Sequence, residues 1–159
     1  MGAAMYAMGC AQWFADWVLA FDEKGARNAF HLPDEENHRL VGGDPEIRIP
    51  LGHWELAPHE ALVIDVVPPR CAYWNVQLAN IWAESLDYEH RQVHLNAHTA
   101  TLADDGSFRC IVAHEDPGHP NWLDTAGHAR GTMGFRWVRA DALPVPQTRV
   151  VDLAQWRRA

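Results

Sequence analysis

The amino-acid sequence predicts a mainly β protein, an antiparallel sandwich or barrel with one helix at the N-terminus. Three observations support this prediction. After residue 46, apolar and polar residues alternate with a period of two in several stretches, as in half-buried strands. Gly, Pro and Asp-Gly separate these stretches at short intervals. No helical pattern lies between them, which favours antiparallel pairing over βαβ units.

The predicted strands differ in how they should be buried. In AYWNVQLAN, Trp74, Val76 and Leu78 share one face, and the polar residues take the other. EALVIDVVPP is apolar throughout, which predicts a strand that is covered on both faces. The strand stretches in chain order are 46–56, 60–69, 72–80, 91–102, 107–115, 131–140 and 147–153.

The N-terminal stretch MGAAMYAMGCAQWFADWVLAF predicts a helix over residues 5–21 and carries one charge, Asp16. Its length could span a bilayer, but Gln12, Asp16 and Glu23 form a polar stripe, so we expect no membrane span. We expect the helix to pack on a homo-oligomeric partner or on a missing N-terminal domain. Residues 1–46 then form the helix and a polar connecting segment that has room for one short helix. Residues 47–159 form the β-sandwich domain with a short C-terminal tail.

Composition excludes some classes of function. The formal net charge of −8 argues against a nucleic-acid partner, which would require a basic surface. Three cysteines without CxxC spacing argue against a disulfide framework and a structural zinc site. The sequence also lacks the pattern of a signal peptide, so we expect a cytoplasmic protein. No cofactor is favoured.

Three histidines recur at every fourth position, His90, His94 and His98. On a helix this spacing would place them on one face and suggest a metal site. On a strand, histidines four residues apart lie about 13 Å apart and cannot share one ion. The Val- and Thr-rich composition favours the strand, so the sequence predicts no helical metal cluster. A metal bound by histidines from separate strands remains an alternative.

The same strand is expected to form a hairpin, because Asp105-Gly106 follows it. A loop of two or four residues would place Phe108, Cys110 and Val112 in one apolar layer with the apolar residues of the first strand. Arg109, Ile111, Ala113 and Glu115 would then join His94, Asn96 and His98 on the other face. A three-residue loop would mix the two sets, so the even register is predicted.

A polar sheet face is the main candidate for a binding site. If the strands 72–80, 91–102 and 131–140 share a sheet, one face carries amides, imidazoles and a guanidinium, while Met133, Phe135 and Trp137 face the core. Such groups can form directional hydrogen bonds to a polar or anionic ligand. The alternative is an ordinary solvent face. The predicted ligand-binding residues are Tyr73, Asn75, Gln77, His94, His98 and Arg136.

Other residues could carry acid–base chemistry. Asp124 and His128, in the run PNWLDTAGHARGTM, could form an acid–base pair if the loop folds back. Alternatively, Asp124 caps a turn and Gly127 adopts a positive φ. The candidate catalytic residues are therefore His94, His98, Asp124 and His128. HEDPGH lacks the spacing of a zinc-binding HExxH helix and contains proline, so it is expected to be a turn.

Asp65 lies within the apolar run LVIDVV. A charge in such a strand must be paired or protonated, or it marks the end of the buried part. Its expected partner is Arg48, Arg109 or Arg136.

Three stretches resemble the domain-of-unknown-function 1214 family: YWNVQLANIWAESLDY, HTATLADDGSFRCIVAHEDPGHPNWLDTAG and GTMGFRWV. The DGS hairpin followed by NWLDTAG is the most specific part, and the resemblance runs from about Ile47 to Val151. It implies a jelly-roll-like β-sandwich, which in longer bacterial proteins commonly follows a domain of the 1254 family. It implies no catalytic residues.

Three functional hypotheses follow. The first is an accessory module that binds a polar small molecule, sugar or carboxylate-like, on the polar face. The second is an enzyme that uses the His and Asp groups named above, with or without a metal. The third is a structural module that oligomerises through the N-terminal helix.

Overall fold

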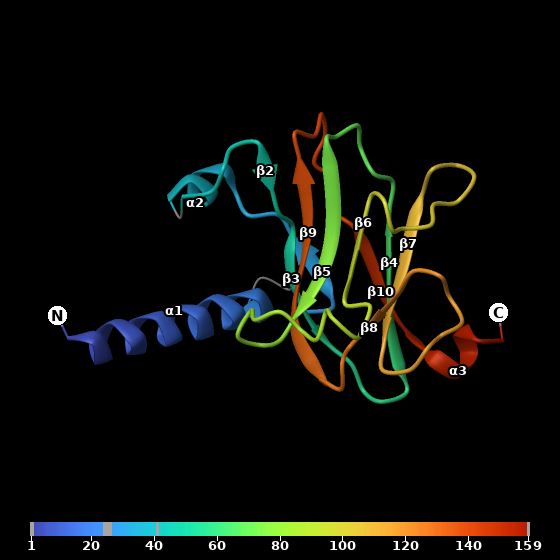
Figure 1. Cartoon of the computed structure of the whole chain (residues 1–159), viewed down its shortest axis with the longest axis horizontal. Coiled ribbons are helices and arrows are strands. Elements are labelled where there is room, and N and C mark those ends of the chain that lie inside the picture. The colour runs from blue at the N-terminus through green and yellow to red at the C-terminus, as the bar shows by residue number, and fades with distance from the viewer. Residues whose placement is uncertain (1, 24–26, 41, 159) are drawn as a thin grey trace.

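The computed structural model describes residues 2–23, 27–40 and 42–158. Two β-sheets pack face to face, and an N-terminal helix, α1 (Ala3–Glu23), extends away from them (Figure 1). This confirms the predicted mainly β sandwich with an N-terminal helix. We call the sheets A and B. The outer face of each is the face that points away from the other sheet.

Sheet A has six strands in the order β1-β3-β9-β5-β6, with β2 paired to β9. Their bounds are β1 (Ala29–His31), β2 (Ile47–Arg48), β3 (Leu51–Glu55), β5 (Tyr73–Ala79), β6 (His94–Asn96) and β9 (Arg130–Val138). Sheet B has four strands in the order β10-β4-β7-β8. These are β4 (Glu60–Val66), β7 (Phe108–Ala113), β8 (Trp122–Asp124) and β10 (Gln147–Asp152). Two short helices complete the fold, α2 (Glu35–Leu40) and α3 (Leu153–Trp156).

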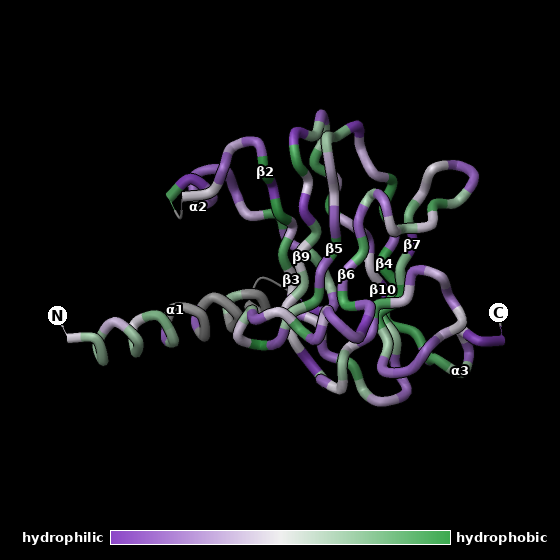
Figure 2. The backbone as a smooth tube through the Cα atoms, in the orientation of Figure 1, coloured by the Kyte–Doolittle hydropathy of each residue, from purple (hydrophilic) through white to green (hydrophobic). Residues whose placement is uncertain are grey.

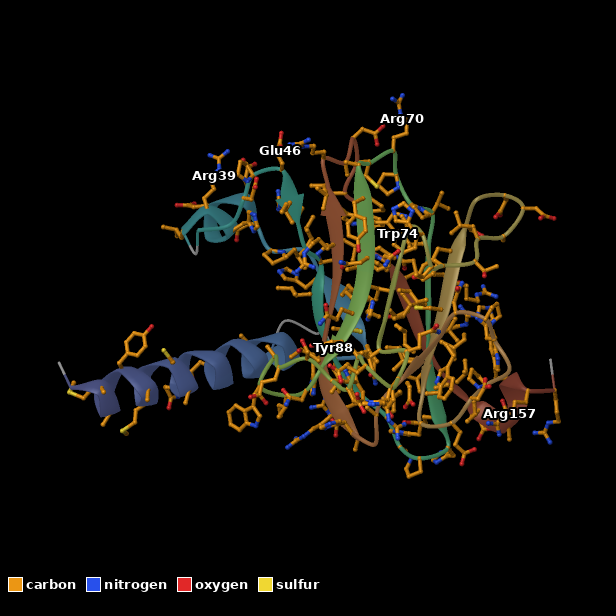
Figure 3. All side chains as sticks on the ribbon, in the orientation of Figure 1. Arg39, Glu46, Arg70, Trp74, Tyr88 and Arg157 are labelled. Carbon is orange, nitrogen blue, oxygen red and sulfur yellow. The ribbon has the colours of Figure 1, made fainter. Side chains whose placement is uncertain are left out.

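The core between the sheets follows the predicted alternation. Trp74, Phe135 and Trp137 are buried, and Figure 3 shows Trp74 between the two sheets. Trp74 contacts Phe108 of sheet B, with ring centroids 4.8 Å apart, and stacks on Phe135 at 5.5 Å. Aromatic pairs in this distance range add attraction beyond the area that they bury. The odd and even positions of β5 and β9 therefore separate the core from the outer face.

Strand β4 is covered on both faces, as its continuous apolar run predicts. Leu62 and Ile64 belong to the core between the sheets. Ala61 and Val63 belong to a second cluster on the outer face of sheet B, which Leu153 of α3 also joins. The outer face of sheet B is thus partly closed by the chain itself.

The predicted hairpin of residues 91–115 is wrong in two respects. Strand β6 pairs with β5 in sheet A, whereas β7 pairs with β4 and β8 in sheet B. Leu102 and Phe108 form only an isolated bridge, around a three-residue turn in which Gly106 has a φ of 80°. The turn therefore takes the odd register. Because the chain crosses from sheet A to sheet B, Arg109 and Ile111 lie on the outer face of sheet B, whereas His94 lies on the outer face of sheet A.

The strand that carries the histidines is also shorter than predicted. It ends at Asn96, whose side-chain oxygen accepts hydrogen bonds from the backbone N–H groups of His98 (2.8 Å) and Thr99 (3.2 Å). An Asn side chain that bonds to the backbone two residues on favours a turn over a strand. His98 consequently lies in a turn and does not share the strand face with His94.

Two further features differ from the sequence predictions. Strand β8 lies in a run that was interpreted as a loop, and it pairs in parallel with β7 within a sandwich that was predicted to be antiparallel. Strand β1 lies in the stretch interpreted as a connecting segment, yet it pairs with β3 and places Phe30 in the core. The short helix expected in that segment is present as α2.

In Figure 1, α1 and α2 stand on the side of sheet A that faces away from sheet B. The described residues near the start of α1 are exposed, and Figure 2 colours this part white to green although it stands clear of the sheets. Within the described part of the chain, no helix is long and apolar enough to cross a bilayer.

Candidate functional site

Strands β5, β6 and β9 place their polar residues side by side on the outer face of sheet A. Asn75 of β5 lies opposite Asn96 of β6 and Arg136 of β9. Gln77 lies opposite His94 and Gly134. Tyr73 precedes Asn75 by two positions and therefore points to the same side. We call this set the polar face: Tyr73, Asn75, Gln77, His94, Asn96 and Arg136.

The side chains of the polar face are joined by long hydrogen bonds. The Asn75 amide donates to the Tyr73 hydroxyl at 3.4 Å, and Arg136 Nη1 donates to Asn75 Oδ1 at 3.4 Å. Gln77 Nε2 donates to Ser85 Oγ at 3.5 Å. These distances exceed the usual range of about 2.7–3.2 Å. The donors and acceptors of the polar face are therefore only weakly satisfied by one another.

Arg136 has no carboxylate partner among the described residues. Its side chain is half-buried, and its contact among the described residues is the 3.4 Å hydrogen bond to Asn75. Some other arginines do pair with carboxylates: Arg139 pairs with Glu46 at 2.7 Å and Arg91 with Asp124 at 2.7 Å. Arg48 of β2 is half-buried like Arg136, but it donates a short hydrogen bond to the Pro33 carbonyl at 2.7 Å. A guanidinium that is withdrawn from water without a carboxylate is a natural partner for an anion.

Only part of the outer face of sheet A is open. His53 and Thr132 lie opposite each other on this face, and they are only 4% and 5% exposed. The Thr132 hydroxyl donates to the Asn80 carbonyl at 3.2 Å, and α1 lies against β3 at this end of the sheet. The residues around Arg136, by contrast, are half-buried or exposed. The structure thus leaves the end of the sheet around Arg136 accessible to a ligand.

The candidate acid–base residues are not brought together. Asp124 is bound by Arg91 at 2.7 Å and accepts the Ala126 N–H at 2.8 Å, so it stabilises its own loop. His128 is exposed in the turn that follows, in which Gly127 has the expected positive φ of 82°. His94 lies on sheet A and His98 in a turn. Among the contacts of the described residues, Asp124 is therefore not a partner of His128.

No metal centre is formed in the described ranges, where no group of three or more His, Cys, Asp or Glu side chains could hold an ion. A depression of about 480 Å³ lies beside α2 and is lined by Glu35, Glu36, Arg39 and Leu40. It rests on one short helix, away from the polar face.

Sequence reasoning missed two contributors to the polar face. Ser85 returns to the sheet through an isolated bridge to Ala79 and meets Gln77 there. Gly134 occupies the centre of the face, between Leu51 and Gln77. Ser85 gave no signal because its position depends on a long loop. The glycine, in the middle of an otherwise good strand pattern, was a signal that could have been used.

On the outer face of sheet B, Asp65 forms a charged cluster with two arginines. Arg109 Nε and Nη2 lie 2.5 and 3.2 Å from its carboxylate oxygens, and Arg149 Nη1 lies 2.6 Å away. Burial by itself would raise the pKa of Asp65, but the hydrogen bonds from Arg109 and Arg149 outweigh it and lower the pKa. Arg109 is one of the partners that the sequence suggested, and Arg149 is not. The cluster is a structural ion pair within sheet B.

Fold and site together define a two-sheet β-sandwich with a polar, partly open outer face. Among solved structures, the chain is similar to an uncharacterised protein from Burkholderia cenocepacia, with 50% identity and a TM-score of 0.82 over 89% of this chain. It is also similar in fold to the VPA0106 protein from Vibrio parahaemolyticus, with 17% identity and a TM-score of 0.59 over 74% of this chain. The chain spans 39% and 34% of the lengths of these two proteins. Comparison with protein-family models and with curated proteins gives no match.

Proposed function

We propose that the protein is an accessory module that binds a polar small molecule, sugar or carboxylate-like, on the polar face of sheet A. The observation that carries this proposal is the half-buried guanidinium of Arg136, which has no carboxylate partner among the described residues. An anionic group on the ligand would balance this charge. The amides of Asn75 and Gln77 would then supply directional hydrogen bonds.

The proposal is consistent with the weak internal bonding of the face. Polar side chains that already form short, well-aligned hydrogen bonds lose them when a ligand binds, which reduces the net gain. The hydrogen bonds of Asn75, Arg136 and Gln77 are 3.4 or 3.5 Å long, so less hydrogen-bond energy is lost when a ligand replaces them. The face is also held by the central strands β5 and β9, so little ordering is needed on binding.

Substitution of Arg136 by glutamine tests the proposal. Binding of acetate, succinate, D-glucuronate and glucose would be measured by calorimetry and by chemical-shift changes. We expect at least one acidic member to bind to the wild-type protein and to bind about 10- to 100-fold more weakly to Arg136→Gln, because a charge-assisted bidentate contact is lost.

The matched control is Arg139→Gln. Arg139 directly follows β9, and it already pairs with Glu46. It should leave every affinity unchanged. Equal affinities of wild-type and Arg136→Gln protein for all four compounds would show that the polar face does not bind this class of ligand.

A second candidate function is assembly through α1. Met5 and Met8 lie three residues apart on α1 and are 64% and 73% exposed. Exposed apolar side chains near the start of a helix favour a second copy of the chain as their partner. Light scattering should find a dimer or larger species that Met5→Glu with Met8→Glu converts to monomer. The control Leu102→Glu changes an exposed apolar residue elsewhere. A wild-type monomer at all concentrations would contradict this candidate.

We also propose that the chain is a member of the 1214 family with a jelly-roll-like sandwich. The DGS and NWLDTAG stretches support this, together with the two-sheet architecture. A solved family member whose strands follow a different order in the two sheets would contradict it.

A further inference from the structure

Gly134 lies at the centre of the polar face, on the central strand β9. Its direct neighbours across the sheet are Leu51 of β3 and Gln77 of β5, and Arg136 follows two positions along on the same face. The glycine is half-buried. Its φ is not positive, so its backbone conformation does not require glycine. A glycine inside a strand weakens that strand, since it packs no side chain and loses more conformational entropy on folding.

Two other glycines of sheet A are explained by packing. A Cβ atom on Gly52 would lie 2.0 Å from the Ala29 carbonyl oxygen, and one on Gly131 would lie 2.1 Å from the Ala79 carbonyl oxygen. Both positions exclude any side chain. A Cβ on Gly134 would meet its nearest atoms, Ile49 Cγ2 and Leu51 Cδ2, at 3.4 Å, which is an ordinary contact. The fold therefore has room for alanine at position 134, but glycine stands there.

Glycine in a strand often marks a place where a ligand approaches the backbone closely. At Gly134 the half-buried backbone, which no side chain of its own covers, lies beside two aliphatic side chains, Ile49 and Leu51, and near Arg136, which has no carboxylate partner among the described residues. An apolar group could rest on the backbone there, against these side chains, while an acidic group reaches the guanidinium. The Cα atoms of positions 134 and 136 are about 7 Å apart in a strand, so the two groups of the ligand must be close together.

We infer that the ligand of the polar face is a small carboxylate with a flat apolar group, such as a short arylalkanoate, and that Gly134 selects it by leaving the strand backbone uncovered. This inference rests on the proposed function and specifies its ligand. Arg136 binds the carboxylate, and Ile49 and Leu51 contact the apolar group. A sugar fits this part of the face less well, because its hydroxyl groups would meet aliphatic carbon atoms.

The test compares 3-phenylpropionate with acetate, which has the carboxylate but no ring. Calorimetry would be performed on the wild-type chain and on Gly134→Ala, Gly134→Ser and Arg136→Gln. We expect Gly134→Ala to weaken the binding of 3-phenylpropionate at least 10-fold and to leave the binding of acetate within about 2-fold. Its Tm should equal or exceed that of the wild type, because alanine is accommodated at ordinary contact distance. Gly134→Ser provides a second variant with the same expected loss.

Gly9→Ala is the matched control, because nothing lies within 4 Å of a Cβ added there and the residue is on α1. It should change neither affinity. If Arg136→Gln abolishes binding of both compounds while Gly134→Ala and Gly134→Ser leave 3-phenylpropionate unaffected, the inference is wrong and the proposed function stands. If Arg136→Gln changes no affinity, both the inference and the proposed function are wrong. A wild-type protein that binds acetate as tightly as 3-phenylpropionate also overturns the inference.

Discussion

Replacement of Asn121 by alanine is expected to lower the free energy of unfolding by about 2–4 kcal/mol. Asn121 is 2% exposed and precedes β8. Its side-chain oxygen accepts the Thr101 N–H at 2.8 Å, and its amide donates to the carbonyl oxygens of Thr101 (2.6 Å) and Arg109 (2.8 Å). Alanine would leave these three backbone groups without their partner.

The position of Asn121 explains the size of the effect. Residues 97–102 leave sheet A and lead to β7 in sheet B, without a strand ladder to satisfy their backbone. At Thr101, the Asn121 side chain supplies the hydrogen bonds to the backbone N–H and carbonyl that a neighbouring strand would otherwise supply. Its loss should therefore loosen the crossover between the sheets as well as the start of β8.

Urea unfolding and thermal melting would measure this effect, and a loss of about 3 kcal/mol corresponds to a fall in Tm of roughly 6–12 °C for a domain of this size. Gln155→Ala removes an exposed amide on α3 and should change stability by less than about 0.5 kcal/mol. A loss below about 1 kcal/mol for Asn121→Ala would mean that water replaces the side-chain bonds at the exposed Thr101.

Replacement of Asp65 by asparagine should cost about 1–3 kcal/mol at pH 7 and should make stability less dependent on pH. The carboxylate holds Arg109 and Arg149 across three strands of sheet B, at distances of 2.5 and 2.6 Å. An amide cannot balance two guanidinium groups. The half-exposed position of both arginines limits the cost, because water can solvate them.

The sign of the pH dependence follows from the lowered pKa. Because the folded state holds the pKa of Asp65 below its ordinary value of 3.8, the folded state favours the ionised carboxylate. The stabilisation is therefore fully present above about pH 5 and is lost as the pH falls through 3.8 and below. The difference in unfolding free energy between wild type and Asp65→Asn should shrink over this range.

Urea titrations at pH 7, 5 and 3.5 would measure this difference. Glu46→Gln, which breaks the exposed pair with Arg139, is the control and should show little change at any of these values. A further titration at pH 2.5, well below 3.8, completes the series. A difference between wild type and Asp65→Asn that is the same at pH 7 and pH 2.5 would exclude the ionised carboxylate as its cause.

The β class, the N-terminal helix and the division of β5 and β9 into a core side and an outer side could all be predicted from the sequence. These features follow from a period of two or from a continuous apolar run, and such patterns are local. Trp74 and Phe135 can be assigned to the core because they are large and apolar and alternate with residues that are polar or small, and this pattern can be recognised without knowing the neighbouring strand. The burial of β4 on both of its faces could be predicted in the same way, from its continuous apolar run.

The pairing of the strands, by contrast, depends on contacts between distant parts of the chain. The sequence predicted a hairpin at Asp105-Gly106. In the structure, the Asn96 side chain ends β6 by forming a turn, and the chain then crosses to the other sheet. The sequence also suggested an acid–base pair of Asp124 and His128, but Asp124 forms an ion pair with Arg91 instead. Contacts between residues far apart in the chain depend on how the sheets close, and no local pattern encodes them. The polar face therefore contains Tyr73, Asn75, Gln77, His94 and Arg136 from the predicted set but not His98. Ser85 reaches it through tertiary structure alone, whereas the place of Gly134 follows from the strand alternation.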